Sequence, residues 1–213
     1  MRSVRRCIPL HPDHNRYYLV DANFLANKRI NPDLIQDPSE KKRVERAKEY
    51  WKIIDAQLKK DEARVYILDL CIAEAFKVLA KKYYNKEKIF KNHSSYKHAK
   101  EGLQKDIQLS TKDARSSRRV VRYHDIQTNR DIIISVDRFF EKACKQKKGV
   151  SVVDLLILAC SKYLIDFYGI KKEELYIISQ DQPLYELAKS YQDLPAAFNP
   201  SQDADLASKV FTS

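Results

Sequence analysis

Four short apolar runs, each closing on an acidic residue, are the feature that most limits what this chain can fold into. They span Tyr17–Asp21, Val65–Asp69, Ile132–Asp137 and Leu175–Asp181. All are rich in β-branched and aromatic residues and do not alternate with polar ones, which is typical of strands buried on both faces of a parallel sheet. A fifth, weaker strand candidate is Pro195–Phe198.

Helical periodicity fills the intervals between these runs. Apolar residues recur at helical spacing over 44–58, after the turn Asp37-Pro38-Ser39, and again over 72–83. Residues 152–167 predict a buried helix ending at Gly169, and 183–191 predict a short last helix. Strands alternating with helices predict one three-layer α/β/α domain over residues 1–213 with a mostly parallel central sheet.

The positive charge of the chain is concentrated in one segment. Residues 81–130 contain 14 Lys/Arg and 5 Asp/Glu, whereas the rest of the chain contains 26 and 24. Residues 85–130 also break the strand–helix rhythm, so we expect a basic, partly helical insertion between the second and third strands. Its densest cluster is Arg115, Arg118, Arg119 and Arg122, which share one face if helical and suit a phosphate backbone. The alternative is a solvated loop with no dedicated partner.

Four carboxylates are expected at one edge of the sheet. Asp21 ends the first strand, Glu74 follows the second, Asp154 opens the buried helix and Asp181 follows the fourth strand. In open parallel sheets functional groups gather beyond the carboxyl ends of the strands.

Each acid also has a purely structural explanation. Asp21 and Asp181 could cap helices, Asp154 could belong to a capping box with Ser151, and Glu74 could pair with Lys77. Four acids crowded together repel one another, however, and a divalent cation would compensate that repulsion. Oxygen-only ligands favour Mg²⁺ or Mn²⁺ over zinc. Such a metal site together with a basic segment favours a nuclease.

These residues also carry a family resemblance. Tyr18-Leu-Val-Asp21-Ala-Asn23, Leu70-Cys-Ile-Ala-Glu74, Ser151-Val-Val-Asp154 and Ile177-Ile-Ser179-Gln-Asp181 resemble, in order, the four motifs of PIN domains. The resemblance covers roughly residues 17–84 and 131–200 and implies a Mg²⁺- or Mn²⁺-dependent endoribonuclease. The four acids would be its catalytic metal ligands. Asn23 and Ser179 would orient Asp21 and Asp181.

The long basic insertion departs from compact toxin-type PIN domains. The resemblance therefore leaves open a toxin with an antitoxin-like partner, an RNA-processing enzyme, or a nuclease module of a larger complex, and it makes a homodimer reasonable. Tyr83, Tyr84, Phe90 and Tyr96 could stack on unpaired bases. With no signal peptide and no bilayer-spanning apolar stretch, we expect a cytoplasmic protein without a membrane partner.

Two other classes of protein compete with the nuclease. One is a non-catalytic RNA-binding scaffold with the same fold, which would bind RNA without metal. The other is a phosphoacceptor signalling domain, which would need adjacent early acids and a lysine after the last strand, and neither is present.

Overall fold

Five parallel strands form a single sheet in the order β3-β2-β1-β4-β5. The computed structural model describes residues 16–84, 89–90, 92–107, 123–145 and 149–211. The strands are β1 Arg16–Val20, β2 Ala63–Leu68, β3 Tyr123–Ile126, β4 Leu175–Ile178 and β5 Ala196–Phe198. Val20 pairs with both Ile67 and Ile178, so the carboxyl ends of the three central strands lie level.

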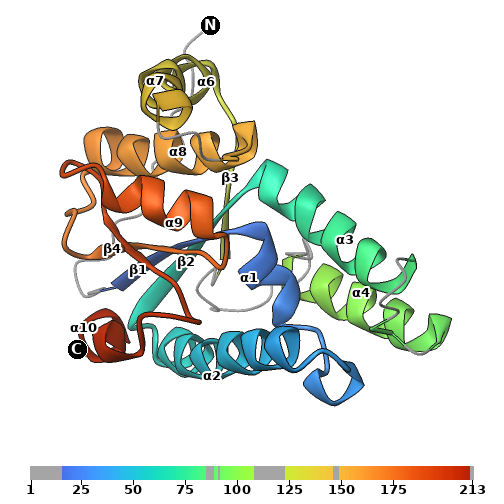
Figure 1. Cartoon of the computed structure of the whole chain (residues 1–213). Helices are drawn as coiled ribbons and strands as arrows, with labels where there is room; N and C mark the ends of the chain where they lie inside the picture. Colours follow the sequence, from blue (N-terminus) through green and yellow to red (C-terminus); the bar gives the residue numbers. More distant parts are fainter. Residues whose placement is uncertain (1–15, 85–88, 91, 108–122, 146–148, 212–213) are drawn as a thin grey trace, which may run out of the picture.

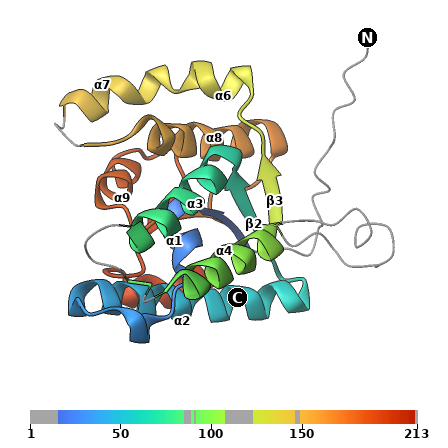
Figure 2. The ribbon, with the colours of Figure 1, turned by 90° about the vertical axis from the view of Figure 1, so that its right-hand side faces the viewer.

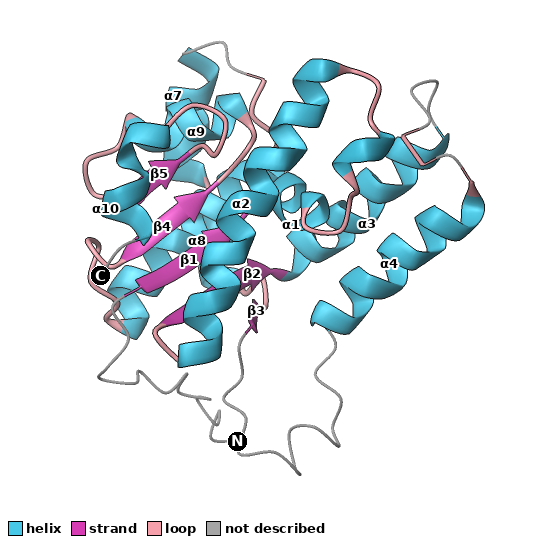
Figure 3. Ribbon diagram, turned by 90° about the horizontal axis from the view of Figure 1, so that it is seen from below, coloured by secondary structure: helices cyan, strands magenta, loops and turns pink. Residues whose placement is uncertain are grey.

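Helices cover both faces of this sheet, which confirms the predicted three-layer α/β/α class. In Figure 1, α8 and α9 lie above the strands, with α6 and α7 beyond α8, and α2 and α10 lie below them. Figure 2, turned by 90°, shows the same layers, and α3 and α4 lie together at one side in Figures 1 and 3. The α-helices are α1 Ala22–Asn27, α2 Pro38–Lys60, α3 Asp69–Tyr84, α4 His93–Ile107, α6 Arg130–Ser135, α7 Asp137–Lys145, α8 Val152–Tyr168, α9 Gln182–Lys189 and α10 Ala207–Phe211, and the 3₁₀ turns are η1 Pro32–Leu34 and η2 Ala204–Leu206.

The long helix α2 is fixed to the sheet and to α1. It begins where predicted, because the Asp37 side chain accepts hydrogen bonds from the backbone N–H groups of Ser39 and Glu40. Trp51 stacks on Phe24 of α1 with ring centroids 4.8 Å apart, and its Nε1 donates to the Phe24 carbonyl at 2.8 Å. These contacts hold the middle of α2 against α1.

The buried helix α8 matches its predicted bounds. Ser151 caps its start, and it ends at Gly169, which has a φ of 70° in the left-handed region. Its middle, from Leu155 to Ser161, is fully buried, as expected of a core helix. No helix in the described part of the chain is long and apolar enough to cross a membrane.

The predicted third strand, Ile132–Asp137, is wrong. Its residues form helix α6 and the start of α7, with Asn129 accepting a hydrogen bond from the Ile132 N–H at the helix start. Ile132 is buried, but Ile133 and Ile134 are 55% and 61% exposed, which an interior strand would not allow. The third strand in the chain is Tyr123–Ile126, paired only with β2 at the edge of the sheet.

Part of the predicted basic insertion, residues 85–130, belongs to the folded domain. Helix α4 packs on α3, where Tyr83 and Tyr96 stack with centroids 5.0 Å apart. Arg29, which follows α1, pairs with Asp106 in the last turn of α4. The described residues of the range 85–130 therefore include helix α4 and the edge strand β3.

We expect Gly169→Ala to destabilise the protein by roughly 1–2 kcal/mol, because alanine carries a Cβ that opposes the left-handed conformation. No atom lies within 4 Å of the added Cβ, so the loss would come from the backbone alone. Gly149→Ala is the matched control, since it also meets open space and lacks a positive φ. Urea unfolding measures both; equal stabilities would contradict the assigned role of Gly169.

Candidate active site

The order of the strands reverses between β1 and β4, and two of the predicted acids lie at this point. Asp21 directly follows β1, and Asp181 follows β4 by three residues. Glu74 lies in the second turn of α3, after β2, and Asp154 lies in the first turn of α8. This is the edge where parallel α/β sheets place their ligands.

The carboxylate of Asp21 is almost fully buried and joins the two halves of the site. Its Oδ1 accepts the Phe24 N–H at 2.6 Å, which caps α1. Its Oδ2 accepts the Ser179 hydroxyl at 2.5 Å and the Gln180 N–H at 2.9 Å. Burial raises the pKa of Asp21, while these three hydrogen bonds and the charge of Arg43 oppose the rise.

Ser179 connects Asp21 to Asp181. Besides donating to Asp21, its hydroxyl oxygen accepts the backbone N–H of Asp181 at 2.9 Å. The Asp181 side chain in turn accepts the Leu184 N–H at 3.0 Å and so caps α9. The side chain of Ser179 thus holds the Asp21 carboxylate and the Asp181 backbone, and not the Asp181 carboxylate.

Asp154 forms the capping box that its sequence allows. Its Oδ2 accepts the Ser151 N–H at 2.8 Å and the Ser151 hydroxyl at 2.7 Å. Burial, followed by the negative charges of Asp181 and Asp21, raises the pKa of Asp154 to about 6 against the hydrogen bonds from Ser151. The negative charges of two nearby carboxylates thus add to the effect of burial on the pKa of Asp154.

Glu74 has no structural partner among the described residues. The sequence allowed an ion pair with Lys77, but the structure contains none, and no other described side chain or N–H binds Glu74. Its charge nevertheless reaches the site. Burial raises the pKa of the neighbouring Cys71 thiol, and the charges of Asp21, Glu74 and Asp154 raise it further.

A fifth acid at this edge, Asp69, has a structural role. It directly follows β2, and its carboxylate binds the hydroxyl of Thr128 and accepts the Thr128 N–H at 3.2 Å. This contact ties the segment after β3 to the start of α3. Asp69 therefore stands apart from the other acids in what it binds.

Capping and metal binding are compatible at these residues. Oδ1 of Asp154, Oδ2 of Asp181 and both carboxylate oxygens of Glu74 accept no hydrogen bond from the described residues. Free carboxylate oxygens suit Mg²⁺ or Mn²⁺. As the side chains stand, however, no three His, Cys, Asp or Glu groups of the described chain are close enough to hold a metal ion together.

Two residues that sequence reasoning missed lie beside the acids. Arg43 of α2 donates to the Gln180 carbonyl at 2.7 Å, and the Gln180 side chain returns a 2.8 Å bond to the Arg43 carbonyl. Gln180 is buried and also accepts from Asn27 at 2.7 Å. By contrast, Asn23 forms no hydrogen bond to Asp21 in the structure; the signal for Gln180 was its place beside Asp181.

The structure describes only some of the residues that were predicted to bind nucleic acid. Arg115, Arg118, Arg119 and Arg122 lie outside the described residues. Of the aromatic residues expected to stack on bases, Phe90 is buried, and Tyr83 and Tyr96 stack on each other. Tyr84, 70% exposed, is the member of that group that presents its ring to solvent.

Comparisons with known proteins find distant structural likeness only. No family model and no curated protein matches the chain. Similar solved structures include VapBC2 from Rickettsia felis bound to a DNA fragment from its promoter (12% identity, 86% of this chain and 98% of that one, TM-score 0.47). Others are FitAcB from Neisseria gonorrhoeae (16%, 87% and 99%, 0.46) and PAE2754 from Pyrobaculum aerophilum (17%, 88% and 92%, 0.45).

We expect Asp154→Asn to become more stable relative to the wild type as the pH rises from about 4 to about 7. The folded-state pKa of about 6 lies above the ordinary aspartate value of 3.8, so ionisation destabilises the folded wild type over this interval. The gain is at most about 3 kcal/mol. Urea unfolding of the metal-free proteins at several pH values measures it, and a difference that did not change with pH would contradict the raised pKa.

Proposed function

We propose that the chain is a PIN-type, metal-dependent endoribonuclease that hydrolyses RNA phosphodiester bonds. The observation that supports it most directly is the placement of Asp21, Asp154 and Asp181 at the carboxyl edge of the sheet, around the point where the strand order reverses. A fold gains no stability from gathering like charges, so the cluster is better explained by a cationic ligand.

Asp21, Glu74, Asp154 and Asp181 are the residues that would hold Mg²⁺ or Mn²⁺. When bound, such a cation lowers the pKa of an attacking water and stabilises charge on the phosphate oxygens. The rest of the work falls to the chain. Ser179 and the Gln180 N–H keep the Asp21 carboxylate in one orientation. The capping box does the same for Asp154 and leaves its Oδ1 free toward a ligand.

Three parts of this proposal rest on the motif resemblance. They are RNA as the substrate, an antitoxin-like or complex partner, and a homodimer. The competing function, a non-catalytic RNA-binding scaffold, predicts RNA binding that is indifferent to metal. Glu74 distinguishes the nuclease from the scaffold, because a scaffold does not need an acid that has no structural partner among the described residues.

Cleavage of a labelled mixed RNA pool tests the proposal, with Mn²⁺, with Mg²⁺ and with EDTA. We expect cutting only with metal, and a loss of more than about 100-fold in Glu74→Gln and in Asp154→Asn, since each removes a ligand charge. Glu74→Gln is the cleaner variant, because no hydrogen bond or ion pair to a described residue is lost.

Glu173→Gln and Asp166→Asn are the matched controls. Glu173 is exposed and precedes β4 at the opposite end of the strand, and Asp166 is exposed near the far end of α8. Both should cut like the wild type. RNA binding without cutting under every metal condition would instead favour the scaffold.

A further inference from the structure

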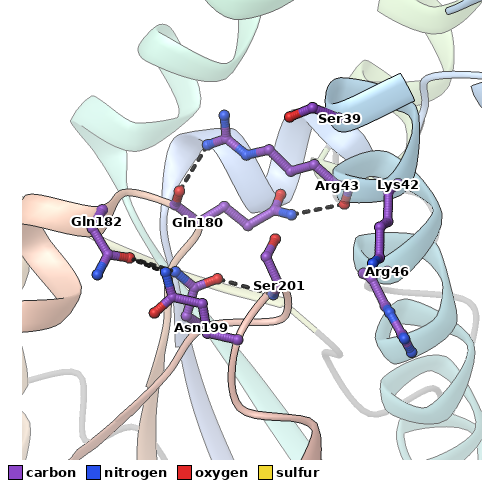
Figure 4. A pocket seen from close by; sticks show the side chains of 9 residues that line it. Ser39, Lys42, Arg43, Arg46, Gln180, Gln182, Asn199 and Ser201 are labelled. Carbon is purple, nitrogen blue, oxygen red and sulfur yellow. Dashed lines mark hydrogen bonds between the residues drawn. The ribbon is translucent and has the colours of Figure 1, made fainter. Parts of the chain in front are cut away.

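A polar hollow lies next to Asp181, between α2 and the segments that follow β4 and β5. Its volume is about 430 Å³, within the range of small-ligand sites. Figure 4 shows the α2 residues on one side and residues of 180–202 on the other. Gln180 and Gln182, the two neighbours of Asp181 in the chain, both line it, so the hollow adjoins the proposed catalytic edge.

The α2 wall carries one stripe of cations. Ser39, Lys42, Arg43 and Arg46 line the hollow and follow one another at i, i+3, i+4 and i+7, which places them on one helix face. The lining contains no carboxylate and no apolar side chain. Glu40 and Glu49 pair with Arg43 at 3.6 Å and with Arg46 at 3.2 Å from outside the lining.

The opposite wall is fixed by its own hydrogen bonds. Oε1 of Gln182 accepts from the Asn199 amide at 3.2 Å and from the Gln202 amide at 2.6 Å, and the Asn199 side chain accepts the Ser201 N–H at 2.9 Å. These bonds hold the polar groups in place before any ligand arrives. A rigid polar wall loses little entropy on binding.

Three donors in the hollow are left without a partner. The hydroxyls of Ser39 and Ser201 and the ammonium group of Lys42 form no hydrogen bond or ion pair to other described residues. Donors and positive charge without any carboxylate match the oxygens of a phosphodiester group. A hollow lined by carboxylates would instead suit a metal cation.

We propose that this hollow binds the phosphodiester next to the one that is cut, and so sets the path of a single-stranded RNA across the acids. The proposal rests on the nuclease function for the identity of the strand. Lys42 and Arg46 contact the phosphate by charge, and Ser39 and Ser201 by neutral hydrogen bonds. Arg43 contributes less to this phosphate because it already binds the Gln180 carbonyl.

Binding of a fluorescent six-nucleotide RNA in EDTA tests this without any cleavage. Lys42→Gln/Arg46→Gln should weaken binding roughly tenfold or more at 0.1 M salt and make the log K against log salt slope shallower by about 1.4. Lys52→Gln/Lys59→Gln, two exposed cations elsewhere on α2, is the matched control and should bind like the wild type. Equal losses in the two pairs would overturn the proposal in favour of general charge attraction.

Ser39→Ala/Ser201→Ala should weaken binding a few-fold with an unchanged salt slope. Unchanged affinity in this variant would show that the strand does not enter the hollow, and would overturn the proposal. Inorganic phosphate at matched ionic strength should not displace the RNA; displacement would make this a free-phosphate site instead. None of these binding experiments requires cleavage. If Lys42→Gln/Arg46→Gln weakens RNA binding but the wild type never cleaves RNA, the hollow is retained as a binding site and the nuclease function is rejected. If the wild type cleaves RNA but the variant binds it with unchanged affinity, the nuclease function is retained and the role of the hollow is rejected.

Discussion

The buried carboxylate of Asp21 is the point on which the arrangement of the site depends. It accepts one N–H from α1 and two groups from the segment after β4, so a single side chain joins the two crossovers that leave the centre of the sheet. Each donor offsets part of the desolvation of a charge that burial disfavours, and loss of one would cost about 1–3 kcal/mol. The position of Asp181, through Ser179, follows from this one group.

Negative and positive side chains occupy separate regions around Asp21. The four acids lie after β1 and β4, in the second turn of α3 and at the start of α8, while the cations of α2 line the hollow next to Asp181. Arg43 donates to the Gln180 carbonyl, and its charge opposes the rise that burial causes in the pKa of Asp21. A polyanion that crossed the hollow would thus be drawn to the acids by the cations, and a metal ion would be needed for it to stay there.

The sequence predicted the elements whose patterns are local and failed where tertiary pairing decides. Uniformly apolar runs marked β1, β2 and β4, and caps at Asp37 and Gly169 fixed the ends of α2 and α8. The three consecutive isoleucines of 132–134 suggested a strand, but burial of Ile132, Val136, Phe139 and Ala143 follows a helical period across α6 and α7. Strand β3 was missed because Tyr-His-Asp-Ile is short and polar, and an edge strand needs only one partner. The sequence did not predict the basic face of α2 formed by Lys42, Arg43 and Arg46, because acidic residues on the other faces of the helix offset its charge in a count of net charge.

The four acids differ in what the fold would lose without them, and this bears on how such a protein would drift over evolutionary time. Asp21, Asp154 and Asp181 each cap the start of a helix, so a lineage that lost the proposed activity would still retain those residues for stability. Glu74 has no hydrogen bond or ion pair to the described residues and so caps or ties nothing there. Descendants that had become pure binding proteins would therefore vary first at position 74 while keeping the other three acids, and would go on resembling an active enzyme at every position but that one.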